Sequence, residues 1–181
     1  SRIATVLLPG VQYLTGQALD VAAITAAAHR AGCTVEFDLA HAIGNVTLDL
    51  HEAGVDFAAW CNYKYLNGGP GCVGGAFVHA RHAHDSGLPR LAGWWGHDPA
   101  TRFLMGPDFR PTPGAEGWQL SSPPILAMAP LAASLEHFAT AGLPALRQKS
   151  IELTGYFERL VQQLLAGRVV DRARETERVA A

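Results

Sequence analysis

Four short apolar runs constrain the fold more than any other feature of the sequence. Runs of this length that end at a turn or a polar residue are typical of buried strands. Between the first two lies an alanine-rich segment, Asp20 to Arg30, with helical spacing. Strands that alternate with helices or irregular crossovers predict an α/β fold with a mostly parallel sheet flanked by helices. The expected strands lie within residues 3–8, 34–38, 55–63 and 75–78.

Residues 49–53 predict a brief helix between the second and third strands. The chain changes character at residues 86–124, which are rich in Gly, Pro and Trp and show no clear period. They predict a long ordered loop region, and such regions often carry function. Helical patterns follow from Ile125 and again after Pro144, the second with an amphipathic stripe.

A break at Gly142–Pro144 separates the two predicted helices and favours a domain boundary close to it. We expect residues 1–124 to be the second half of a large domain. Residues 125–181 would supply connecting helices and the start of a small α+β domain, with a charged and frayed tail from Asp171.

Composition excludes several classes of protein. Of the 181 residues, 49% are hydrophobic and 17% are charged, so a core can form and general disorder is excluded. The net charge of −2 gives no reason to expect nucleic acid or an anionic membrane as a partner. No apolar run reaches the roughly 18 residues of a membrane span. Both ends look cut, so we expect an internal fragment of a longer protein.

Three cysteines, Cys33, Cys61 and Cys72, form no CxxC pair. An odd number without paired spacing argues against a disulfide framework or a zinc site. Free thiols in a reducing cytoplasm are the expected state.

Two weak motifs have plainer explanations. Gly69–Gly74 matches the dinucleotide pattern GxGxxG, but the residues after it resemble a strand rather than a helix. A tight turn that needs positive φ is the favoured interpretation. His79, His82 and His84 have the close spacing of metal ligands, but no Cys or acid completes a set, so we expect exposed imidazoles and no metal.

Asp38 and Lys64 are more informative because each stands at the end of an apolar strand. Asp38 could cap the next turn, or it could face a cationic partner. Lys64 could extend its amine into solvent, or it could be a desolvated amine nucleophile. The chain has only two lysines against 12 arginines, which makes an incidental lysine in an apolar setting less expected. An aspartate and a lysine at neighbouring strand ends suit pyridoxal phosphate (PLP), whose ring nitrogen needs an acid and whose aldehyde needs an amine.

Four blocks of sequence resemble the kynureninase family of fold-type-I PLP hydrolases, which act in tryptophan catabolism and NAD biosynthesis. They are Asp38–Asn45 (DLAHAIGN), Trp60–Asn67 (WCNYKYLN), Gly93–His97 (GWWGH) and Ser121–Ile125 (SSPPI). The Asp38 and Lys64 blocks are shared with other members of the class-V aminotransferase-like superfamily. The GWWGH block is more particular to kynureninases. The fold implied is a fragment of a PLP-dependent transferase-like large domain with the start of the small domain.

The resemblance also implies roles for individual residues. Lys64 would bind the cofactor aldehyde as a Schiff base, Asp38 would pair with the pyridine nitrogen, and Tyr63 would contact the phosphate and transfer protons. The catalytic residues implied are therefore Lys64, Asp38 and Tyr63.

Further cofactor contacts would come from His41 beside the ring, from Trp94 of the neighbouring subunit of a homodimer, and from Ser122, where relatives have Asn or Thr. Pro9 stands where some relatives have a contacting serine, and proline has no hydroxyl. Trp95 and His97 would line the aromatic ring of the substrate.

The implied reaction is hydrolysis of L-kynurenine, or its 3-hydroxy form, to an anthranilate and L-alanine. Two alternatives stay open at the level of sequence. The chain could derive from another PLP enzyme, such as a cysteine desulfurase or an aminotransferase, or the fragment could be inactive because its site is incomplete.

Overall fold

The computed structural model describes residues 3–85 and 87–165. The elements, in chain order, are β1 (Thr5–Pro9), α1 (Val21–Arg30), β2 (Thr34–Asp38), β3 (Phe57–Cys61), β4 (Gly74–Val78), the 3-10 turns η1 (Ala80–His82), η2 (Arg102–Leu104) and η3 (Gly114–Trp118), and the helices α2 (Ile125–Ala141) and α3 (Leu143–Leu164).

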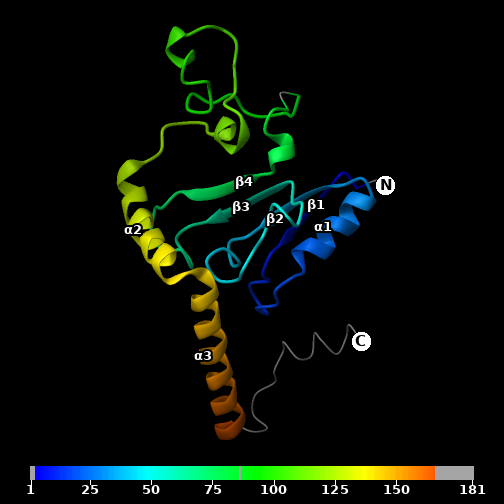
Figure 1. The fold of residues 1–181 in the computed structure, drawn as a ribbon, viewed down its shortest axis with the longest axis vertical. Helices are drawn as coiled ribbons and strands as arrows, with labels where there is room; N and C mark the ends of the chain where they lie inside the picture. The colour runs from blue at the N-terminus through cyan, green and yellow to red at the C-terminus, as the bar shows by residue number, and fades with distance from the viewer. Residues whose placement is uncertain (1–2, 86, 166–181) are drawn as a thin grey trace.

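The four strands form one sheet in the order β1-β2-β3-β4 (Figure 1). Strands β1, β2 and β3 are parallel, and β4 runs antiparallel to β3. The prediction of a mostly parallel α/β sheet flanked by helices is therefore confirmed. Because the three parallel strands end at the same edge, the residues that follow them meet there.

Helix α1 packs against one face of this sheet and builds the core. Val35 and Phe37 point to that face and are fully buried, and Ala28 of α1 belongs to the same cluster. The helix starts where Asp20 caps it, its side chain accepting a hydrogen bond from the Ala23 amide at 2.9 Å. On the opposite face Leu7 is 60% exposed, so α1 does not cover that face.

Residues 49–53 form a turn, not the brief helix that their sequence predicts. The Ala53 amide donates to the Asp49 carbonyl at 3.0 Å, which is one helical hydrogen bond. Gly54 then takes a positive φ of 71°, and the chain enters β3. Only a single helical turn fits this short connection, because β3 begins three residues after Gly54.

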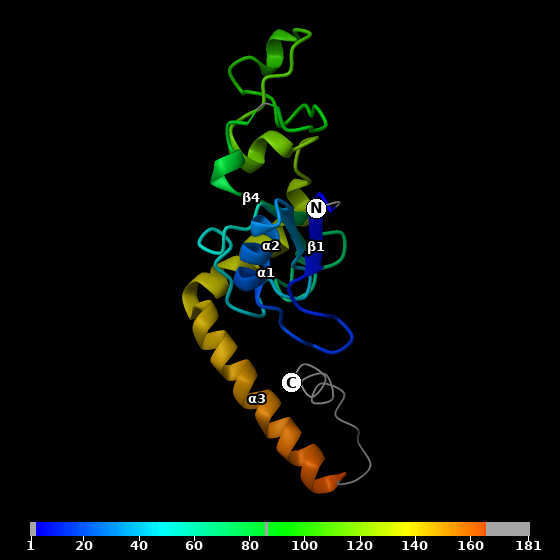
Figure 2. The same cartoon turned by 90° about the vertical axis from the view of Figure 1, so that its right-hand side faces the viewer.

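The loop region, residues 87–124, lies beyond β4, on the side of the sheet far from β1 (Figure 1). It contains η2 and η3 and otherwise follows turns without regular structure. Helix α3 extends away from the sheet in both views (Figures 1 and 2), and none of its residues is buried. None of the helices in the described ranges is both long and apolar enough to cross a membrane. The predicted frayed tail from Asp171 lies outside the described residues.

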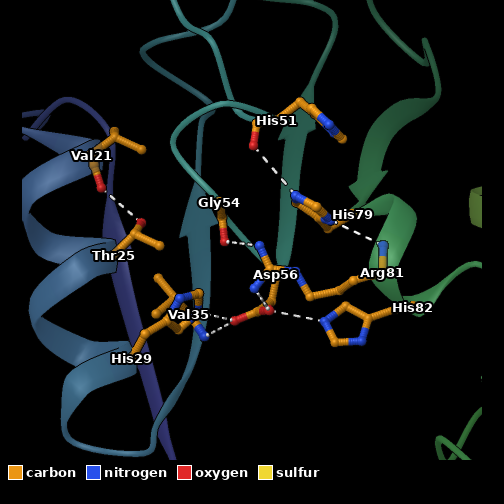
Figure 3. Close-up of polar contacts among 10 residues, drawn as sticks. All are labelled: Val21, Thr25, His29, Val35, His51, Gly54, Asp56, His79, Arg81 and His82. Carbon is orange, nitrogen blue, oxygen red and sulfur yellow. Dashed lines mark hydrogen bonds and ion pairs between the residues drawn. The ribbon is translucent and has the colours of Figure 1, made fainter.

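A buried carboxylate joins four segments at the amino ends of β2 and β3 (Figure 3). Asp56 is only 4% exposed. Its Oδ2 atom accepts from the Val35 amide at 2.9 Å and lies 2.7 Å from Nε2 of His29 on α1. Its Oδ1 atom lies 2.9 Å from Nε2 of His82 and 3.5 Å from Nη1 of Arg81. We call Asp56 with His29, Val35, Arg81 and His82 the Asp56 clamp.

The expectation of exposed imidazoles at this strand end is wrong for two of the three histidines. His79 is buried at 9% exposure and stacks on His51, with ring centroids 4.6 Å apart. His82 binds Asp56 and stacks on Phe57 at 5.1 Å. Only His84 of the three is exposed. Sequence spacing could not reveal this, because the partners, His51 for His79 and Asp56 for His82, are distant along the chain.

The surroundings shift the pKa of two of these groups. Burial alone would raise the pKa of Asp56, but hydrogen bonds from His29, His82 and the Val35 amide outweigh burial and hold the pKa below its usual value. Burial, followed by the positive charge of Arg81, lowers the pKa of His79. The fold therefore favours an ionised Asp56 and a neutral His79.

Removing the Asp56 carboxylate should destabilise the fold strongly. The substitution Asp56→Ala leaves the Val35 amide and two imidazoles without their acceptor, and breaking a buried ion pair typically costs about 3–5 kcal/mol. We expect a loss of that size in the free energy of unfolding, measured by urea denaturation of the purified protein. The matched control is Asp108→Ala, an exposed carboxylate in the loop region, which should change stability by less than about 0.5 kcal/mol. Equal stability of the two variants would contradict the role of the Asp56 clamp.

The lowered pKa of His79 predicts a pH dependence of stability. The unfolded state binds this proton more readily than the folded state, so the contribution of His79 is complete above the ordinary value of 6.5 and is lost as pH falls through the folded value. We expect His79→Gln to lose less stability than the wild type between about pH 7.5 and about pH 5. Parallel pH profiles of the urea midpoint for the two proteins would refute this expectation.

Candidate active site

The carboxyl edge of the parallel strands collects the residues that the sequence points to. Strand β1 ends at Pro9, which pairs with Asp38 at the end of β2, and Asp38 pairs in turn with Ala59 of β3. The Gly10 amide donates to the Asp38 carbonyl at 2.9 Å. Lys64 follows three residues after the end of β3. Each of these residues leaves the sheet at the same edge because the strands share one direction.

Asp38 caps the turn that follows it and remains exposed. Its Oδ1 atom accepts a hydrogen bond from the Ala40 amide at 2.8 Å. This contact supports the capping interpretation of the sequence, but it involves a backbone amide two residues away and leaves the carboxylate at the surface. The carboxylate is thus both fixed in place and free to meet a cationic group.

Lys64 and His41 come together at this edge although 23 residues separate them. The Nζ atom of Lys64 lies 3.1 Å from Nε2 of His41, within hydrogen-bonding distance. The amine is half-buried and lies 5.6 Å from the ring centroid of Tyr63, whose side chain is 54% exposed. The His41 ring has Tyr13 and Tyr65 as neighbours, each with its centroid 6.3 Å away. An amine, an imidazole and several phenols therefore gather at the carboxyl edge of the sheet, where β2 ends at Asp38.

The loop that carries Lys64 is closed by Asn62, a residue that sequence reasoning missed. Asn62 is 5% exposed, and its Nδ2 donates to the Val73 carbonyl at 2.8 Å while its Oδ1 accepts from Nε1 of Trp60 at 2.9 Å. The Asn62 carbonyl accepts from the Gly68 amide at 2.8 Å. A Cβ at Gly68 would lie 3.0 Å from that carbonyl and even closer to Cys72, so only glycine fits this closure. A polar side chain among apolar strand residues is the signal that could have identified Asn62.

The glycine-dense segment after this loop is a turn. Gly69 and Gly71 both take a φ of 77°, and Gly74 already belongs to β4. The interpretation as a tight turn rather than a dinucleotide site is confirmed for these residues, because strand β4, and not a helix, follows the turn directly.

A second group of candidate residues lies in the loop region. Trp94 is 43% exposed and contacts Phe103 edge-on at 5.6 Å. Trp95 lies beneath the guanidinium of Arg102 at 4.4 Å, and Nε2 of His97 lies 3.0 Å from Oγ1 of Thr101. Ser122 is exposed just before α2.

The two groups do not meet within this chain as far as it is described. No hydrogen bond or ring contact in residues 3–85 and 87–165 joins Trp94, Trp95, His97 or Ser122 to Asp38, His41 or Lys64. Two cavities border the second group, one of 730 Å³ beside Trp95 and one of 290 Å³ beside Trp94 and His97. Among the described residues no cluster of three or more His, Cys, Asp or Glu has the arrangement of a metal site.

Solved structures with this fold include PLP enzymes. The cysteine desulfurase CsdA of Escherichia coli superposes with a TM-score of 0.70 at 22% identity, covering 91% of this chain and 39% of the other. A C-DES mutant with glycine covalently linked to its PLP cofactor gives a TM-score of 0.71 at 25% identity, covering 89% of this chain and 42% of the other. The likeness to the first shows the fold alone.

Curated relatives are much more similar in sequence. The kynureninase of Xanthomonas campestris pv. campestris (strain B100) is 65% identical over 160 residues, which are 88% of this chain and 38% of the relative. Those of Koribacter versatilis and Myxococcus xanthus are 62% and 63% identical, over 97% and 92% of this chain and 42% and 39% of their own lengths. The chain thus spans about two fifths of the length of these relatives. The sequence model of the family "Aminotransferase class-V" matches residues 1–181, and the chain therefore belongs to the class-V aminotransferase family.

Proposed function

We propose that the protein carrying this chain is a PLP-dependent hydrolase of L-kynurenine or 3-hydroxy-L-kynurenine, with an anthranilate and L-alanine as products. The observation that carries the proposal is the 62–65% identity to proteins named kynureninase. The contact of 3.1 Å between Lys64 and His41, at the strand edge where Asp38 ends, supports it from geometry. The likeness to a cysteine desulfurase at 22% identity does not favour that activity, because it reflects the fold.

The groups at the carboxyl edge fit this cofactor by their chemistry. A primary amine suits an aldehyde, and an exposed carboxylate suits a protonated ring nitrogen. We propose that Lys64 binds the cofactor covalently, Asp38 accepts a hydrogen bond from the ring nitrogen, and His41 and Tyr63 contact the cofactor beside them. Pro9 can contribute only its ring and carbonyl at this edge, because it has neither a hydroxyl nor an amide hydrogen.

When bound, PLP supplies an electrophilic carbon and a cationic ring that withdraws electrons from the α carbon of the substrate. The residues of this chain hold and move protons around it. With the cofactor bound, the Lys64 amine would be the group that takes the α proton of the substrate, and His41 lies within hydrogen-bonding distance of its Nζ. Asp38 would keep the ring nitrogen protonated. Tyr63 is the candidate for proton transfer at the side-chain carbonyl that water attacks.

The second group of residues would complete the site across a homodimer. Trp94 and Ser122 are proposed phosphate contacts, and Trp95 and His97 are proposed to line the substrate ring. Their separation from Lys64 in the described part of one chain supports a contribution from the neighbouring subunit. We further propose a boundary between the second half of a large cofactor-binding domain, residues 1–124, and connecting helices that start a small domain, residues 125–181. The three free cysteines are in keeping with a cytoplasmic protein.

The covalent role of Lys64 has a direct test, for which the chain offers a matched control. The purified protein is incubated with PLP, reduced with borohydride and digested, and the labelled peptide is identified by mass spectrometry. We expect the label on Lys64 and its loss in Lys64→Ala, with anthranilate formation lost as well. Lys149, the other lysine, lies exposed on α3, and Lys149→Ala should keep both label and activity. Label on Lys149, or sulfide or a keto acid in place of anthranilate, would overturn the proposal.

Asp38 should separate cofactor attachment from turnover. In Asp38→Ala the amine of Lys64 is intact, so borohydride should still fix PLP to the protein. Turnover of kynurenine should fall by at least about a hundredfold, because the ring nitrogen loses the group that keeps it protonated. A rate near that of the wild type, with anthranilate followed by its fluorescence, would refute the role of Asp38.

A further inference from the structure

The backbone of the segment Gly93–His97 is held at its two glycines by Thr112 and by the residues that follow η3. The Gly96 amide donates to the Gln119 carbonyl at 2.8 Å, and the Gly96 carbonyl accepts from the Thr112 amide at 2.8 Å. A Cβ at Gly93 would overlap the backbone of Gln119 and Leu120. These contacts fix the backbone of the segment at its glycines, and they leave the two tryptophans and His97 to be oriented by something else.

Arg102, in η2, supplies that orientation for Trp95. One terminal nitrogen, Nη2, donates to the Trp95 carbonyl at 2.7 Å and to the His97 carbonyl at 2.9 Å. The same guanidinium lies over the Trp95 ring, with Cζ 4.4 Å from the ring centroid. A single side chain thus fixes the backbone on both sides of Gly96 and covers one face of the indole by a cation–π contact.

Thr101, the residue before Arg102, orients the imidazole ring of His97. Its Oγ1 lies 3.0 Å from Nε2 of His97, and its amide donates to the Asp98 carbonyl at 3.0 Å. The Arg102 amide donates to that same carbonyl at 2.9 Å. The turn at Asp98 therefore brings Thr101 and Arg102 back onto the residues that they support.

Arg102 also stands between the two cavities of the loop region. It lines the cavity of 730 Å³ together with Trp95 and the cavity of 290 Å³ together with Trp94 and His97. A lysine at this position could not both hydrogen-bond the two carbonyls and stack on Trp95, because it carries a point charge on a flexible stem and has no planar group.

We infer that Arg102 and Thr101 are positioning residues for recognition of the substrate's aromatic ring, acting through Trp95 and His97. The inference rests on the proposed function, in which these two residues line that ring. Neither Arg102 nor Thr101 needs to touch the substrate. Their loss should weaken capture of the ring and leave the chemistry at Lys64 intact.

The test is a split between KM and kcat in the holoenzyme. For Arg102→Lys we expect KM for L-kynurenine to rise about tenfold, the scale of a lost pocket contact, and kcat to stay within about threefold. The inhibition constant of L-alanine, which has no ring, should stay within about twofold of the wild type. The matched control is Arg110→Lys, an exposed arginine in the same loop region, which should leave all three constants unchanged.

Thr101→Val gives a second, nearly isosteric variant. It removes the hydroxyl from His97 and should also raise KM for kynurenine without changing the L-alanine constant. Thermal melting shows whether each variant is folded, and a variant that melts early but keeps the wild-type KM counts against the inference. An unchanged KM in both variants, an equal rise in Arg110→Lys, or an equal rise in the L-alanine constant would overturn it. A wild type that binds PLP and forms no anthranilate would instead reject the proposed function.

Discussion

The carboxylate of Asp56 fixes how β2 lies against β3, and the edge that holds the candidate active site depends on that alignment. The ladder between the two strands begins with Glu36 opposite Phe57. One position earlier, the Val35 amide donates to the Asp56 side chain at 2.9 Å. A slip of one residue would remove this bond and turn every side chain of the strand to the other face. The far ends of the same strands carry Asp38 and lead to Lys64, so the register set at one edge places the chemistry at the other.

The strands of the sheet, and the residues at its carboxyl edge, could largely be predicted from the sequence, because short segments of sequence carry both signals. An apolar run that stops at Asp38, and another that is followed by Lys64, mark strand ends without knowledge of neighbours. The Asp56 clamp could not be foreseen, because a buried charge is stable only with partners that the fold brings together. For the same reason the sequence predicts His79 and His82 at the surface, since their partners are not visible in it.

The loop region marks the other limit of sequence reasoning. It has no hydrophobic period, and its path depends on close backbone contacts at Gly93 and Gly96 and on side chains such as Arg102 and Thr101. The motif Gly93–His97 can be noticed in the sequence, but its support lies outside the motif. The resemblance named the residues proposed to face the ligands, and the structure adds those that hold them in place.

The partners of Asp56 have a consequence for the order in which the chain folds. His29, Val35, Arg81 and His82 all precede the loop region, so the Asp56 clamp can close before that region has formed. All partners of the Asp56 carboxylate are therefore present in the chain once residue 82 has been synthesised, before any residue of the loop region. The Asp56 clamp takes none of its contacts from the aperiodic segment that carries Trp94 and Trp95, so that segment can be rebuilt without touching the alignment of β2 with β3.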